Sequence, residues 1–167
     1  MYDLEFLPGH PPQPIWQAGI DWTVNPDYGV LTVKAKGIKQ EINLSSQDRP
    51  AAIARMLDTL VTGETKVLAN LADISIVGHR VVHGGTEYSQ ATMITPPVKE
   101  TIKKLIPLAP SHNPAHLEGI EAIEQVFGDV PQVAVFDTAF HRSIPPESSL
   151  YPILNVKKTW HKKSLPL

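Results

Sequence analysis

The sequence contains no cysteine, no long apolar run and no excess of one charge. Without cysteine the chain can form neither a disulfide framework nor a zinc–thiolate site, and it has no thiol nucleophile. No apolar run approaches the roughly 20 residues of a membrane span, and the first residues lack the basic start of a secretory signal. We therefore expect a cytoplasmic protein with no membrane partner.

The charged residues are nearly balanced overall but unevenly distributed. Fifteen Lys and Arg against seventeen Asp and Glu give a net charge of −2, so nucleic acid is not an expected partner. Residues 155–167 are the exception, because they contain lysines and no acidic residue. A basic tail can contact phosphate or an anionic surface, but a solvated chain end is the favoured interpretation.

Three strands are predicted in the first part of the chain, at residues 15–21, 29–36 and 39–44. Residues 15–21 alternate apolar and polar side chains, and the other two segments flank Gly37, a pattern typical of a hairpin. Two later apolar segments, 73–77 and 132–136, predict buried strands, the second of them central in its sheet.

Helices are predicted where apolar residues recur at helical spacing. The first starts at the Asp48 cap and ends at Gly63, the second starts at Pro96, and the third starts at Asn113, which caps it ahead of a proline. The order of elements predicts an α/β fold, with a mixed sheet, flanking helices and an antiparallel portion at its start.

Polar residues directly after the strand predicted at 73–77 form the first candidate site, in the segment Gly-His-Arg-Val-Val-His-Gly-Gly at 78–85. If the strand continues through Val82, Arg80 and Val82 share one face. The guanidinium would then bind a short carboxylate while Val82 lines its alkyl end. The two glycines would allow the backbone to approach a ligand closely.

Plainer alternatives exist for this segment. Arg80 can serve in a structural ion pair, and the glycines can simply form a turn. His79 and His83 have a spacing compatible with metal binding, and with Asp137 and His141 they would suggest a metal hydrolase. Two-residue motifs are weak, however, and most single histidines are hydrogen-bonded parts of the structure.

Two further segments carry candidate residues. His112 lies in the loop before the third helix, where free backbone N–H groups favour an anion, although a capped turn with an incidental histidine is equally compatible. Asp137 follows the strand at 132–136, where open α/β sheets bind ligands. An aspartate there can hold a magnesium-bound water or orient a hydroxyl, or it can simply cap a turn.

Taken together, three segments resemble the acetate kinase (acetokinase) family: HRVVHGG at 79–85, LAPSHNPAHLEGI at 108–120 and FDTAFH at 136–141. The resemblance covers about residues 1–152. It implies the N-terminal domain of an actin-like, sugar-kinase-like (ribonuclease H-like) two-domain fold, lacking its first strand. Residues 153–167 form a basic tail without family resemblance.

The resemblance also implies a function, namely magnesium-dependent phosphoryl transfer between ATP and acetate, giving acetyl phosphate and ADP, usually by a homodimer. By position, Arg80 would bind the acetate carboxylate and the transferring phosphoryl group, and Val82 would line the methyl pocket. His112 would support the site, and Asp137 would lie near magnesium. No ATP-binding residue is identifiable in this chain.

Several departures from the family pattern limit the implied activity. Ser111 stands where the family has Leu in the wall of the acyl pocket, which affects acetate specificity, and His116 stands where Asn is usual. The family's phosphate loops and adenosine-binding segments are missing, so the chain alone is expected to be inactive. The alternative is a non-catalytic interaction module that pairs with the missing half or with a full-length subunit.

Overall fold

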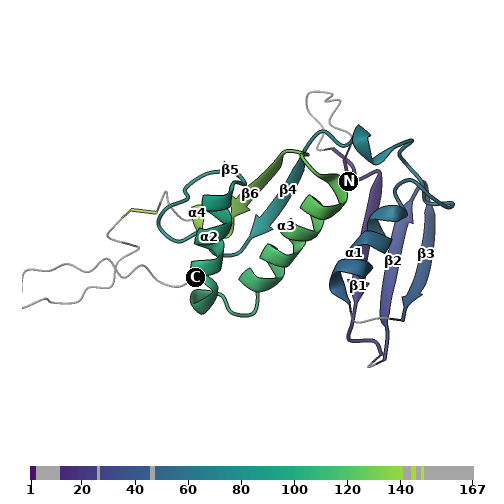
Figure 1. The fold of residues 1–167 in the computed structure, drawn as a ribbon, viewed down its shortest axis with the longest axis horizontal. Coiled ribbons are helices and arrows are strands. Elements are labelled where there is room, and N and C mark those ends of the chain that lie inside the picture. Colours follow the sequence, from purple (N-terminus) through teal and green to yellow (C-terminus); the bar gives the residue numbers. More distant parts are fainter. Residues whose placement is uncertain (3–11, 26, 46–47, 141–143, 146–147, 149–167) are drawn as a thin grey trace, which may run out of the picture. The chain divides into compact units, whose positions relative to one another are not determined.

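The structure is a computed structural model of the 167-residue chain, and it describes residues 1–2, 12–25, 27–45, 48–140, 144–145 and 148. His141 and the basic tail at 153–167 lie outside the described residues, so the expected boundary at residue 152 stays a prediction. The chain divides into two compact units (Figure 1). The first comprises Met1–Ser75 and Glu121–Val130, and the second comprises Ile76–Ile120 and Pro131–Leu167.

The first unit contains an antiparallel sheet in the order β1-β2-β3, formed by Trp16–Asp21, Gly29–Ala35 and Ile38–Leu44. The predicted hairpin is confirmed. Lys36 and Gly37 connect β2 to β3 with φ angles of 52° and 78°. Two-residue turns with both residues in the left-handed region match the natural twist of paired strands, which explains the glycine at this position.

One face of this sheet forms the first core together with helix α1, Arg49–Asp58. The buried residues alternate along β2 and continue within and just after α1: Trp16, Leu31, Val33, Ala35, Leu44, Ala52, Leu57 and Leu60. The other face of each strand therefore points to solvent.

Helix α1 begins as predicted but ends earlier. The Asp48 carboxylate accepts a hydrogen bond from the Ala51 N–H at 3.3 Å, which confirms the cap. The predicted end at Gly63 is wrong, because the helix stops at Asp58. The Thr59 hydroxyl donates to the Met56 carbonyl at 2.7 Å, and the N–H groups of Leu60 and Val61 bond three residues back. The chain therefore reaches Gly63 through tighter turns.

The second unit contains a mixed sheet in the order β4-β6-β5, formed by Val77–Val81, Gln132–Phe136 and Thr92–Met93. Strand β6 is central, as predicted, and it pairs parallel to β4 and antiparallel to β5. The α/β class with a mixed sheet is thus confirmed, while the antiparallel strands at the start form a separate sheet.

The strand predicted at 73–77 is wrong for all but its last residue. Leu71–Asp73 form a short 3-10 helix instead, η1. The Asn70 side chain accepts from the Ala72 N–H at 3.0 Å, and the Asp73 carboxylate accepts from the Asn70 N–H at 3.0 Å. This reciprocal capping closes a turn at residues 70–73, directly before the β-branched residues, and strand β4 starts only at Val77.

The helices of the second unit build its core against the sheet. They are α2 (Pro96–Lys104), η2 (Ile106–Leu108), α3 (Asn113–Phe127) and α4 (Asp137–Phe140). The core consists of Val81, Val98, Ile102, Ile120, Ala134 and Phe136. The last turns of α3 belong to the first unit and pack against its core. Among the described residues, no helix combines the length and apolar character that crossing a membrane requires.

Candidate functional site

The parallel pairing of β4 with β6 brings two distant polar residues to the same end of the second sheet. Val81 at the end of β4 pairs with Phe136 at the end of β6. Val81 and Phe136 both point into the core, so Arg80 lies on the opposite, exposed face of β4. Asp137 directly follows β6 and begins α4.

Arg80 and Asp137 form a bidentate ion pair. Arg80 Nε donates to Asp137 Oδ1 at 3.0 Å, and Arg80 Nη2 donates to Asp137 Oδ2 at 2.9 Å. Two parallel bonds fix the orientation of a guanidinium as well as its position. The Arg80 side chain is still 77% exposed and that of Asp137 38% exposed, so the pair lies at the surface.

The pair changes the protonation of both partners. The hydrogen bonds and charge of Arg80 hold the pKa of the Asp137 carboxyl below its usual value, and Asp137 in turn raises the pKa of Arg80. Hydrogen bonds to the charged form are the main cause in both cases. Both groups are therefore fully charged at neutral pH.

Part of the guanidinium is not used by this pair. Within the described part of the chain, the hydrogen bonds of Arg80 all go to Asp137 through Nε and Nη2. A guanidinium has five N–H donors arranged in a planar fork. The edge formed by Nη1 and Nη2 can therefore bind a second carboxylate or a phosphate group.

His112 directly precedes α3 and His116 lies in its first turn, and their rings stack at a centroid distance of 6.4 Å. Burial lowers the pKa of His116, and the charges of His112, Arg80 and His79 lower it further. Its Nε2 atom is buried without a hydrogen-bond partner among the described residues. His116 is thus neutral at pH 7, within electrostatic range of the Arg80–Asp137 pair.

Asn113 is fully buried, and its role differs from the predicted helix cap. Its Nδ2 atom donates to the carbonyl oxygens of His83 and Ile102, each at 3.2 Å. The side chain therefore ties the loop after β4 to helix α2, rather than closing the first turn of α3. Residue spacing could not predict this, because both acceptors are distant in the sequence.

The glycine pair after β4 approaches protein rather than ligand. A Cβ on Gly84 would lie 2.6 Å from the ring of Phe136. That ring also stacks on Tyr88, with the two ring centroids 5.0 Å apart. The Gly84 N–H donates to the Thr138 hydroxyl at 3.1 Å. Gly85 has a φ of +65°, which fits the predicted turn.

The two histidines weighed as metal ligands have structural partners. His79 Nε2 is 2.6 Å from the side-chain oxygen of Gln132, and His83 Nδ1 accepts from the Gly85 N–H at 3.0 Å. In the part of the chain that the structure describes, no group of three His, Cys, Asp or Glu could hold a metal ion. The described residues therefore give a metal hydrolase no support, and His141 lies outside them.

The remaining predicted site residues are Val82, Ser111 and His112. Strand β4 ends at Val81, so strand alternation does not extend to Val82, which is half-buried. Ser111 and His112 are exposed in the loop before α3. Sequence reasoning missed the contacts of Thr138 and Gln132, although a glutamine inside an apolar strand was a signal that a buried partner was required.

Most of the chain matches a known protein family. Residues 4–164 match the model of the Acetokinase family. An acetate kinase of Microcystis aeruginosa is 95% identical over 153 residues, which are 92% of this chain and 38% of that protein. One of Rippkaea orientalis is 68% identical over 156 residues, with the same coverage. The chain therefore spans about 38% of the length of these curated relatives.

Solved structures give the same result. The crystal structure of Porphyromonas gingivalis acetate kinase matches with a TM-score of 0.78 and 33% identity, over 85% of this chain and 36% of that chain. A propionate kinase from Francisella tularensis matches with a TM-score of 0.71 and 37% identity, over 85% and 35%. These matches confirm the expected actin-like fold class and do not favour the interaction-module alternative.

Replacing Arg80 tests the ion pair through the titration of its partner. In Arg80→Gln, the pKa of Asp137 should rise toward its usual value, as followed by the carboxyl ¹³C signal. Since folding lowers this pKa, the pair stabilises the folded state above the unfolded pKa of the carboxyl. That contribution is lost as the pH falls through the folded pKa. In the control Arg55→Gln, which removes the arginine paired with Asp58, the Asp137 titration should not move. An unchanged Asp137 pKa in Arg80→Gln would contradict the pair.

Gly84→Ala tests the close approach to Phe136. The added methyl group overlaps a buried ring, so we expect a loss of about 1–3 kcal/mol in the free energy of unfolding, measured by urea denaturation. Gly78→Ala is the matched control, because a Cβ at Gly78 has nothing within 4 Å. Equal stability of the two variants would show that the loop moves away from Phe136 at no cost.

Proposed function

The chain belongs to the acetokinase family, and from that premise we propose that it is the carboxylate-binding part of an acetate kinase. The reaction proposed for the whole protein is phosphoryl transfer between ATP and acetate, giving acetyl phosphate and ADP. The observation that carries the proposal is the Arg80–Asp137 pair, an exposed arginine already oriented by one carboxylate with its second edge available for another.

Arg80 has the central role in this proposal. Its free edge binds the two oxygens of acetate, and its permanent charge then stabilises the phosphoryl group that is transferred to one of them. Phosphoryl transfer depends mainly on positioning and on neutralising the charge of the phosphate oxygens, and an oriented guanidinium supplies both. Val82 is proposed to line the methyl side of the ligand, and His112 to support the anion from the start of α3.

Asp137 is proposed to serve the magnesium ion in addition to Arg80. Magnesium is commonly bound through one or two carboxylates together with substrate phosphates, so a single exposed aspartate fits that use. Both oxygens of Asp137 accept from Arg80, but a carboxylate has about four acceptor positions and retains some for a magnesium-bound water. When bound, magnesium neutralises the charge of the ATP phosphates. No residue of this chain is assigned to ATP itself.

The proposal also covers the acyl group of the substrate, the oligomeric state and the cellular location. The structural relatives include an acetate kinase and a propionate kinase. Ser111 is exposed next to His112. We therefore propose acetate or another short-chain carboxylate as the substrate. A homodimer and a cytoplasmic location belong to the same proposal, by analogy with the family.

Acetate binding tests the role of Arg80 directly. In an NMR titration of the labelled chain, we expect acetate to shift the side-chain signals of Arg80 in a saturable way, because the free edge is accessible. Arg80→Gln should weaken binding at least about ten-fold, the loss typical of a charge-assisted bidentate contact. Arg55→Gln is the matched control, since it removes an equally charged, aspartate-paired arginine of the first unit, and it should change the affinity by less than two-fold.

The same preparations can be assayed for acetyl phosphate with ATP, magnesium and acetate, trapping the product as hydroxamate. Because the chain spans only about 38% of its relatives, we expect binding without turnover. Equal acetate affinity in the Arg80 and Arg55 variants would overturn the proposed binding role. Turnover above the blank would contradict only the expected inactivity of the chain by itself.

A further inference from the structure

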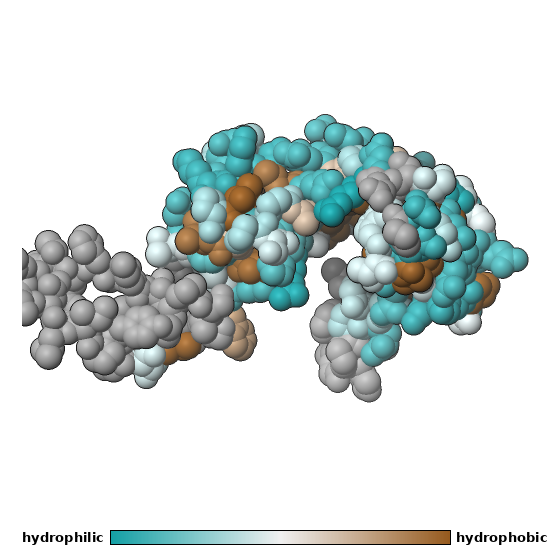
Figure 2. Space-filling view, turned by 90° about the horizontal axis from the view of Figure 1, so that it is seen from below, coloured by the Kyte–Doolittle hydropathy of each residue, from teal (hydrophilic) through white to brown (hydrophobic). Residues whose placement is uncertain are grey.

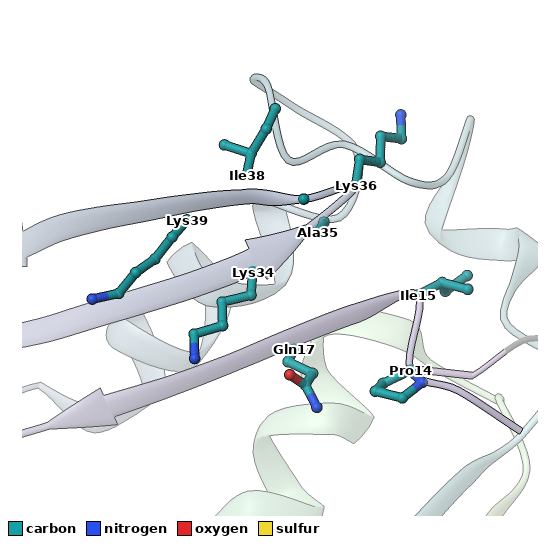
Figure 3. Close-up of a pocket in the computed structure, with 9 residues that line it drawn as sticks. Pro14, Ile15, Gln17, Lys34, Ala35, Lys36, Ile38 and Lys39 are labelled. Carbon is teal, nitrogen blue, oxygen red and sulfur yellow. The ribbon is translucent and has the colours of Figure 1, made fainter. Parts of the chain in front are cut away.

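The outward face of the first sheet carries a shallow pocket with a volume of about 260 Å³, close to the turn between β2 and β3 (Figure 3). All three strands contribute to its lining. Pro14 and Ile15 form an apolar side of the pocket where the chain enters β1. The pocket lies wholly in the first unit, whereas Arg80 and Asp137 belong to the second.

Strand register places three polar side chains of the pocket in one row. Gln17 of β1 pairs with Lys34 of β2, and Lys34 pairs with Lys39 of β3. Their neighbours in β2, Val33 and Ala35, are buried, so the row lies on the solvent face of the sheet. In Figure 3 the side chains of Gln17, Lys34 and Lys39 extend to the same side, while Lys36 and Ile38 extend away from them.

Two like charges directly opposite each other are unfavourable in an antiparallel pair. Lys39 is partly compensated by Glu41, whose carboxylate lies 2.6 Å from its Nζ atom. In the described part of the chain, Lys34 has no such ion pair. The sheet thus keeps an uncompensated lysine beside a second lysine, in a unit that otherwise carries more acidic than basic residues.

We propose that this pocket binds a phosphoryl-bearing anion, either inorganic phosphate or a small phosphate monoester. This inference goes beyond the proposed kinase function. A phosphate dianion has enough charge and oxygen atoms to contact both ammonium groups and to accept from the Gln17 amide. A carboxylate has only one charge and two oxygens. It therefore matches the two lysines and the Gln17 amide less well than a phosphate dianion does. The apolar side formed by Pro14 and Ile15 accommodates a short organic group on a monoester.

An NMR titration of the full chain at constant ionic strength tests the proposal, with inorganic phosphate and phenyl phosphate as separate probes. We expect saturable shifts at Gln17, Lys34 and Lys39, and binding that weakens as salt is raised. Lys34→Gln should weaken binding by about five-fold, the upper range for an exposed charge contact. Lys66→Gln, which removes an exposed lysine elsewhere in the same unit, should change it by less than about two-fold.

A second variant should strengthen binding, so a folding defect cannot explain the result. Glu41→Gln frees Lys39 from its ion pair and should tighten phosphate binding by about two- to three-fold, more than the control Glu64→Gln. Tighter binding of phenyl phosphate, with shifts at Ile15, would identify a monoester site, and equal binding of both probes would identify a site for the free ion. Equal losses in the Lys34 and Lys66 variants, or no saturation at millimolar concentrations, would overturn the proposal.

Discussion

The candidate site depends on the parallel pairing of β4 with β6. Val81 and Phe136 are both buried and lie opposite each other in this pairing, which fixes where each strand ends. Only then does the arginine one position before the end of β4 meet the aspartate one position after β6. A shift of one residue in either strand would reverse which side chains face the core and would separate the two charged groups. The hydrophobic core of the second unit therefore sets the geometry of its polar surface.

Much of the fold follows from local patterns in the sequence. The hairpin around Gly37, the cap at Asp48 and the central position of β6 were all predictable, because each is encoded by neighbouring residues. The errors occur where a polar side chain bonds to the backbone in a way that periodicity does not reveal. Asp73 closes a 3-10 turn in a segment rich in β-branched residues, and the Thr59 hydroxyl marks the early end of α1. Such side-chain bonds compete with regular structure.

The site was predictable residue by residue but not as an arrangement. Strand alternation correctly placed Arg80 on the face opposite Val81, although Val82, expected beside Arg80, lies beyond the end of β4. The end of a buried strand singled out Asp137. Their contact joins positions 57 apart in the sequence, which no spacing rule can supply. The two interpretations of Arg80, ion-pair partner and ligand-binding group, are also compatible, because one carboxylate uses only part of a guanidinium. The bond network of Asn113 was missed for the same reason, since its acceptors come from the loop after β4 and from α2.

The bidentate geometry of Arg80 has a consequence for the direction from which a ligand arrives. A free arginine side chain samples many rotamers, and ordering it costs up to about 2 kcal/mol. Asp137 has already removed most of that freedom, and it also fixes the plane of the guanidinium. A planar anion that uses the remaining edge must enter in this plane, with its substituent pointing away from Asp137. The aspartate thus determines the approach of a ligand that it does not contact.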